Sequence, residues 1–141
     1  MKITADLNVL LDVAQHRLPH YHASEEVLHR ARQGEFGAVL PAHALTTLHY
    51  IIEKHAGTEL ANETVDGLLA DFEVHPVDKA NFQQARQLPL KDFEDAVVAV
   101  VAEATASDFI ITRNVQDFAG STVPVLTPIE FLELLASIQT E

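Results

Sequence analysis

The 141-residue sequence contains no cysteine, and its lysines and arginines together number only nine. Without cysteine the chain can form no disulfide framework, no thiolate metal site and no cysteine nucleophile. The nine basic residues face 21 aspartates and glutamates, which gives a net charge of −12 with histidine neutral. This balance excludes the broad cationic surface by which proteins bind duplex DNA. Any contact with nucleic acid must therefore use a local basic patch or bound cations.

Long apolar runs are also missing. The longest spans residues 96–102 and is closed by an acid at each end, far short of the roughly 18 residues that a membrane span needs. The opening MKITADLN has an aspartate where a signal peptide needs an apolar stretch. We therefore expect a cytoplasmic protein with no membrane partner. The length fits a single domain over residues 1–141.

Short apolar runs alternate with longer segments of helical periodicity, a pattern typical of α/β proteins with a mostly parallel sheet. Strands are predicted at residues 2–5, 37–40, 72–77, 109–112 and 123–126. Helices are predicted at residues 8–15, 24–32, 43–55, 58–70, 78–88, 92–106 and from 128 onward. Ser24, Asp78 and Asp92 are the expected N-caps, and Thr127 with Glu130 forms a capping box. The predicted fold is a three-layer α/β/α sandwich with about five strands and about seven helices.

Acidic residues recur after the predicted strands. Asp6 directly follows the first strand, Asp92, Glu94 and Asp95 begin a helix, and Asp117 lies after the fourth strand. Ligand sites in parallel sheets lie at the carboxyl ends of the strands, where these loops converge if the first strand is central. Gathered carboxylates raise one another's pKa, and a hard divalent cation such as Mg²⁺ or Mn²⁺ relieves that repulsion. Such a site can activate water and clamp a phosphodiester.

The same acids also have an ordinary structural explanation. Carboxylates are frequent at helix starts, because they accept hydrogen bonds from free N–H groups and interact favourably with the helix dipole. Asp92 fits this explanation as an N-cap. Asp95 immediately precedes the most apolar helix of the chain, which makes a functional role more attractive there. Spacing alone leaves both explanations open.

Three segments share an order and spacing with one known family. The chain opens with ITADLNVLLDV, an apolar strand that leads into Asp-x-Asn and a helix. Residues 92–118 read DFEDAVVAVVAEATASDFIITRNVQDF: an acid, an apolar helix, a strand, Thr-x-Asn and then Asp-Phe. The end reads VPVLTPIEFLELL, a short strand and a helix. Together these segments resemble the PIN-domain family, the nuclease-like domain of the VapC toxins, over most of the chain.

The resemblance implies a Mg²⁺- or Mn²⁺-dependent ribonuclease on an α/β/α fold, which acts on single-stranded or structured RNA. It also implies a homodimer and, if the protein is a toxin, a small cognate antitoxin that holds it inactive. By position, the metal ligands and catalytic acids would be Asp6, Asp95 and Asp117. The supporting residues implied around them are Asn8 and Asn114, with Thr112 orienting the site from the end of its strand.

One position departs from the family pattern. The family's second acid is a glutamate on the helix after the second strand, and Thr47 stands there. A hydroxyl is a poor Mg²⁺ ligand compared with a carboxylate. Glu53 lies about 9 Å further along the same helix and on another face, so it cannot replace that group. Either Asp92 or Glu94 compensates, or metal binding is weak, or the protein is a catalytically attenuated PIN domain that binds nucleic acid or protein.

Basic and aromatic residues give weaker signals. Arg113, beside the predicted site, is the best candidate for a phosphate contact, and a solvated arginine at a strand end is the alternative. Arg30, Arg32 and Lys54 are candidates for a weak basic rim. Tyr50 and the phenylalanines fall at positions expected in the core, so no base-stacking platform is predicted.

Other classes of site lack their signature residues. No glycine-rich phosphate loop and no serine in a nucleophile elbow are present. A response-regulator receiver would need a lysine after the last strand, and residues 123–128 contain none. His20 and His22 are expected on a loop without further metal ligands at the usual spacing. His43 is expected at the surface or at a helix cap.

Overall fold

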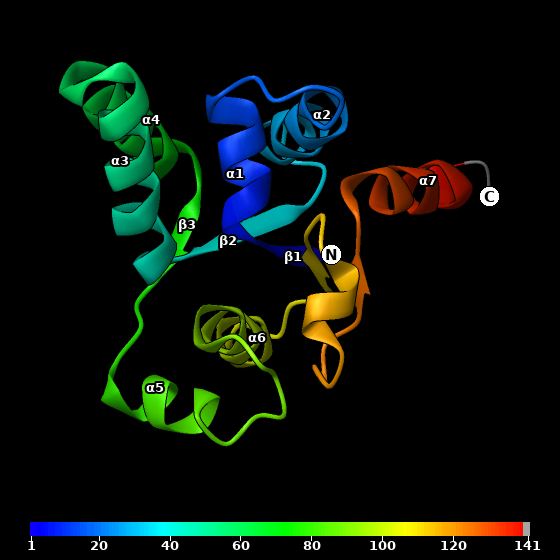
Figure 1. Cartoon of the computed structure of the whole chain (residues 1–141). Helices are drawn as coiled ribbons and strands as arrows, with labels where there is room; N and C mark the ends of the chain where they lie inside the picture. The colour runs from blue at the N-terminus through cyan, green and yellow to red at the C-terminus, as the bar shows by residue number, and fades with distance from the viewer. Residues whose placement is uncertain (140–141) are drawn as a thin grey trace.

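A five-stranded parallel sheet lies at the centre of the computed structural model, which describes residues 1–139 (Figure 1). The strands lie in the spatial order β3-β2-β1-β4-β5 and every neighbouring pair is parallel. Their bounds are β1 (Lys2–Ala5), β2 (Gly37–Pro41), β3 (Glu73–His75), β4 (Phe109–Ile111) and β5 (Val125–Leu126). The first strand is therefore central, and residues 3–5 are buried, as expected of a strand covered on both faces.

Helices cover both faces of this sheet (Figure 1). One face carries α1 (Leu7–Ala14), α2 (Tyr21–Arg32) and α7 (Pro128–Gln139), with α3 (Ala42–Ala56) and α4 (Thr58–Asp71) beside α1. The other face carries α6 (Phe93–Ala104), with α5 (Lys79–Ala85) outside it and the 3₁₀ helix η1 (Val115–Phe118) beside it. This arrangement confirms the predicted three-layer α/β/α sandwich. Over residues 1–139, no helix has both the length and the apolar character needed to cross a bilayer.

Helix α6 is the most deeply buried helix of its layer. Residues 96–102, all alanine or valine, are buried all round, because the sheet lies on one side and α5 and η1 lie on the other. Its small side chains let it pack closely on β1, β2 and β4. A helix buried in this way has little freedom to move, so the acids in its first turn are held in place.

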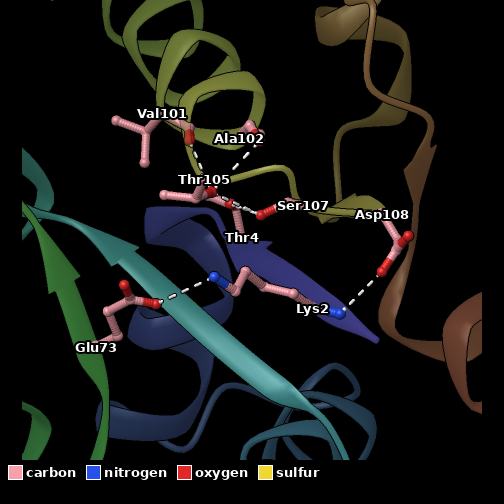
Figure 2. Close-up of polar contacts among 8 residues, drawn as sticks. All are labelled: Lys2, Thr4, Glu73, Val101, Ala102, Thr105, Ser107 and Asp108. Carbon is pink, nitrogen blue, oxygen red and sulfur yellow. Dashed lines mark hydrogen bonds and ion pairs between the residues drawn. The ribbon is translucent and has the colours of Figure 1, made fainter.

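The far end of α6 is fixed to the central strand by buried hydroxyl groups (Figure 2). The hydroxyl of Thr105 donates to the Val101 carbonyl at 2.8 Å and shares a hydrogen bond with Ser107 Oγ at 2.9 Å. Ser107 Oγ in turn lies 2.7 Å from the hydroxyl of Thr4 on β1. These contacts set the position of α6 along β1, and hence the position of its first turn relative to the end of that strand.

Most predicted helix starts are confirmed, and one is wrong. Asp78 and Asp92 accept the expected N-cap hydrogen bonds, and Thr127 with Glu130 forms the expected capping box. Ser24 does not cap α2, which begins three residues earlier. Ser24 is buried instead, with its hydroxyl 3.5 Å from Asp12 on α1. His20 and His22, expected on a loop, lie at the start of α2.

Candidate functional site

Asp6 lies between β1 and β4, at the carboxyl ends of these two strands. Its main-chain N–H donates to the Ile111 carbonyl of β4 at 3.0 Å, which continues the pairing of β1 with β4. Its carboxylate accepts a hydrogen bond from the Leu7 N–H at 2.8 Å and caps α1. Only 6% of Asp6 is exposed, so the carboxylate is held in one direction.

Thr112 joins the loop after β4 to Asp6. Its buried hydroxyl donates to Asp6 Oδ2 at 2.8 Å and accepts hydrogen bonds from Asn8 Nδ2 at 3.0 Å and the Asn114 N–H at 3.2 Å. Asn8 Oδ1 accepts a further hydrogen bond from the Arg113 N–H at 3.2 Å. The structure thus brings the predicted supporting residues together around Asp6. Asn114 contributes its main-chain N–H to this network.

The first turn of α6 brings three more acids to this edge of the sheet. Asp92 Oδ1 accepts a hydrogen bond from the Asp95 N–H at 3.0 Å, so the capping explanation of Asp92 is confirmed. Asp92, Asp95 and Asp117 line one cavity of about 580 Å³. Asp117 comes from η1, so segments distant in the chain converge there as the sequence predicts.

These carboxylates affect one another's protonation. Burial, and then the charges of Asp6, Asp92, Asp117 and Glu94, raise the pKa of Asp95 from 3.8 to about 7. Burial is also the main reason why the pKa of Asp6 is raised, and the nearby charges of Glu94 and Asp92 add to that effect. The hydrogen bonds that Asp6 accepts act in the opposite direction and favour its ionised form.

The chemistry of this cluster fits a hard divalent cation. All of its donor atoms are carboxylate oxygens, and the charges of the neighbouring carboxylates add to burial in raising the pKa of Asp95. Within residues 1–139, no three His, Asp or Glu side chains stand in an arrangement that would hold an ion as they are placed. Mg²⁺ does not need such a cage, because it commonly binds through one or two carboxylates and keeps several waters.

Thr47, the residue in place of the family's second acid, faces this cluster. Its hydroxyl donates to Glu94 Oε1 at 3.4 Å, so α3 meets the first turn of α6 through these two side chains. Of the two acids that could compensate for Thr47, Glu94 is the one in contact with it. Asp92 already uses one oxygen to cap its helix.

His43, expected at the surface or at a helix cap, lies in the first turn of α3 and is half-buried. Burial lowers the pKa of His43, while the carboxylate and main chain of Glu94 partly raise it. The sequence gives no signal for this position, because the approach of α3 to α6 depends on the tertiary fold.

Arg113 forms an ion pair with Asp12 that the sequence motif does not predict. Its Nε lies 2.7 Å from Oδ2 of Asp12, which is fully buried in α1. The signal for Asp12 was present, since a lone acid stands within the otherwise apolar stretch NVLLDVA. The role of Arg113 as a phosphate contact stays a prediction. Arg30 and Arg32, two candidates for a basic rim, form ion pairs with carboxylates.

Three aromatic residues expected in the core are exposed instead. Tyr50 is 62% exposed, Phe82 37% and Phe93 45%. Phe82 and Phe93 contact each other, with ring centroids 5.9 Å apart. The prediction that every phenylalanine is a core residue is therefore wrong. Phe82 lies on the outer helix α5, and Phe93 is the first residue of α6, ahead of its buried part.

Comparisons with known proteins agree with this geometry. A family model described as a PIN domain matches residues 2–116. The chain is 25% identical over 137 residues to Ribonuclease VapC1 of Aquifex aeolicus (strain VF5), with 94% of each chain covered. The solved VapBC2 complex of Rickettsia felis, bound to a promoter DNA fragment, is similar with a TM-score of 0.71 at 14% identity, over 90% of this chain and 98% of the other. A toxin-antitoxin complex from Klebsiella pneumoniae has a TM-score of 0.67 at 18% identity, over 89% and 97%.

Proposed function

The chain belongs to the PIN-domain family, and on that premise we propose that it is a divalent-metal-dependent endonuclease of single-stranded RNA. The observation that carries the proposal is the convergence of Asp6, Asp95 and Asp117 from three separate segments, with the pKa of Asp95 raised to about 7. The ribonuclease that resembles this chain over almost its whole length supports the same reaction. The ion would be Mg²⁺ or Mn²⁺, which suit oxygen ligands.

The protein's own groups have distinct tasks in this proposal. Asp6, Asp95 and Asp117 would hold the ion, which supplies charge neutralisation at a phosphodiester and lowers the pKa of water. Thr112 orients Asp6 and favours its ionised form, because its hydroxyl donates to Oδ2. Asp95 gives up a proton on binding, since at neutral pH it is partly protonated in the metal-free protein.

Glu94 supplies the charge that Thr47 lacks, in our proposal. The Thr47 hydroxyl donates to the Glu94 carboxylate, so the two side chains together do what one glutamate on α3 would do. Glu94 also acts electrostatically on both Asp6 and Asp95, which places its charge within the same cluster.

A catalytically attenuated PIN domain that binds nucleic acid or protein is the second candidate. Two observations favour it: Thr47 brings no charge, and no ready cage for an ion exists within residues 1–139. The two candidates differ in what Thr47→Glu does. Attenuation predicts that this substitution raises metal affinity and activity from a low base. Compensation by Glu94 predicts no gain, because a second carboxylate would then face Glu94.

Cleavage of a 5′-labelled single-stranded RNA in Mg²⁺ or Mn²⁺ tests the proposal. Wild-type protein should cut the RNA, EDTA should stop the reaction, and Asp6→Asn should abolish it while the circular dichroism spectrum stays native. The matched control is Asp66→Asn, an equal change of charge at an exposed position on α4. Retained cleavage by Asp6→Asn, or equal loss in the control, would overturn the assignment.

A small antitoxin is the partner that we propose. Similar structures include complexes described as VapBC2 and as a toxin-antitoxin pair. An acidic cavity favours a basic segment of such a partner, which would bind by an arginine or lysine. Co-expression with the neighbouring small reading frame should yield a complex that inhibits cleavage. The homodimer implied by the family resemblance stays a prediction that sedimentation equilibrium can check.

A further inference from the structure

The segment from α5 to the start of α6 differs in charge from the rest of the chain. Residues 79–91 contain three basic residues, Lys79, Arg86 and Lys91, and no acid, although the whole chain carries −12. All three are exposed, and no carboxylate in the described part of the chain forms an ion pair with them. Four of the other basic residues do form ion pairs: Lys2, Arg30, Arg32 and Arg113.

Two exposed aromatic rings lie on this basic segment. Phe82 comes from α5 and Phe93 is the first residue of α6, and their rings make an angle of 39°. Phe93 directly follows Asp92, which lines the acidic cavity together with Lys91 and Asp95. Phe93 therefore lies next to the cavity lining along the chain, two residues before Asp95, one of the acids proposed to hold the metal.

These two features match the two parts of a single-stranded nucleic acid. An exposed aromatic ring offers a face on which any base can stack, and cations neutralise the phosphates on either side. A basic protein segment of the kind proposed for the acidic cavity would be repelled by three unpaired cations. The charge of this surface thus favours RNA over such a partner.

We propose that α5, the loop after it and the first residue of α6 form the surface that holds the RNA substrate. An unpaired base stacks on Phe93, which Phe82 supports from the side, and Lys79, Arg86 and Lys91 contact neighbouring phosphates. This contact directs an adjacent phosphodiester toward the cavity lined by Asp95 and Asp117. The inference rests on the proposed ribonuclease function and adds the residues that hold the RNA, which has at least one unpaired base at the cut.

The absence of tryptophan from the chain allows a direct test. Phe93→Trp places the only tryptophan on this surface, in an Asp6→Asn background that prevents cleavage. The probe is a 12-nucleotide oligouridylate in Mg²⁺ and, separately, in EDTA. We expect saturable quenching of the tryptophan by the RNA and little quenching by an abasic oligomer of equal length. The matched control, Ile138→Trp, carries its reporter on α7 beside Met1 and should show no quenching.

Affinity and kinetics give a second readout. Phe93→Leu should weaken RNA binding about ten-fold or more and raise KM with kcat largely kept, and Phe93→Tyr should restore both. Replacing Lys79, Arg86 or Lys91 by glutamine should each reduce the slope of log K against log salt by about 0.7. The control is Arg17→Gln, a partly exposed arginine after α1 that forms no ion pair within residues 1–139 and should leave the slope unchanged.

Several outcomes would overturn this surface. Equal quenching by the abasic oligomer would mean that no base stacks, and an unchanged salt slope would mean that the cations do not touch phosphate. If RNA leaves the fluorescence of the Phe93→Trp protein unchanged but a co-expressed partner shields this tryptophan from solvent, the surface binds a protein and not RNA. RNA binding as expected without any cleavage would contradict the nuclease and leave the surface standing. Asp6-dependent cleavage with an unchanged KM in Phe93→Leu would contradict the proposed RNA surface and leave the nuclease standing.

Discussion

Asp95→Asn should stabilise the metal-free protein at the same time as it destroys the proposed metal site. The pKa of Asp95 is raised to about 7 in the fold, from its ordinary value of 3.8. The native protein therefore holds a proton on this group over a pH range in which the unfolded chain has lost it. The stability that this proton contributes is full below pH about 4 and is lost as the pH rises through about 7.

The magnitude follows from the size of the shift. A shift of about three pKa units corresponds to about 4 kcal/mol for a group shielded from water. Asp95 is half-buried, so solvent screening reduces this cost to about 1–2 kcal/mol. Asparagine carries no charge and avoids that cost. At pH 8 the substitution should therefore raise the melting temperature by about 3–7 °C for a chain of this length.

Thermal melts in EDTA at pH 5 and pH 8 measure the effect. The gain should be largest at pH 8 and clearly smaller at pH 5, because at pH 5 native Asp95 still holds its proton and only the unfolded chain has lost most of it. Asp66→Asn, the exposed control on α4, should show no comparable gain at either pH. An Asp95→Asn protein that is no more stable than wild type at pH 8 would refute the view that uncompensated charge is concentrated at this edge of the sheet.

Three further predictions follow from the same contacts. Thr112→Val removes the hydroxyl that donates to Asp6. It should lower the free energy of unfolding, measured in urea, by about 2–3 kcal/mol and weaken Mn²⁺ binding about ten-fold. Thr112→Ser should recover most of both losses. Asp12→Ala leaves Arg113 without its buried partner and should lower the free energy of unfolding by about 2–4 kcal/mol. The double variant Asp12→Leu with Arg113→Met should be about as stable as the wild type in the same urea assay. Mg²⁺ at 100 times its Kd should raise the free energy of unfolding by about 2.7 kcal/mol. A given Mg²⁺ concentration should stabilise the protein less at pH 5 than at pH 8, because protons compete for the carboxylates. Thermal melts across a series of Mg²⁺ concentrations check both.

The sheet and the position of the acids could be predicted because both depend on local pattern. Runs such as FIIT mark buried strands, and acids directly after strands meet at one edge of a parallel sheet. The capping residues Asp78 and Asp92 were likewise visible, since their effect reaches only three residues along the chain.

Contacts between elements distant in the chain could not be read in this way. The approach of Thr47 on α3 to Glu94 on α6 depends on how two layers pack, and no periodicity encodes it. The exposure of Phe82 and Phe93 was missed for a related reason. α5 is too short for its apolar pattern to show that one face lies open to solvent.

Mn²⁺ titration by calorimetry at pH 8, on wild-type protein and on Asp6→Asn, is the most direct measurement of whether these carboxylates hold a divalent ion. We expect saturable binding by the wild type and loss of that binding in the variant. Two results would contradict the metal-dependent site: Mn²⁺ binding that is unchanged in Asp6→Asn, or no Mn²⁺ binding by the wild type even in the presence of single-stranded RNA. Either result would favour the attenuated PIN domain.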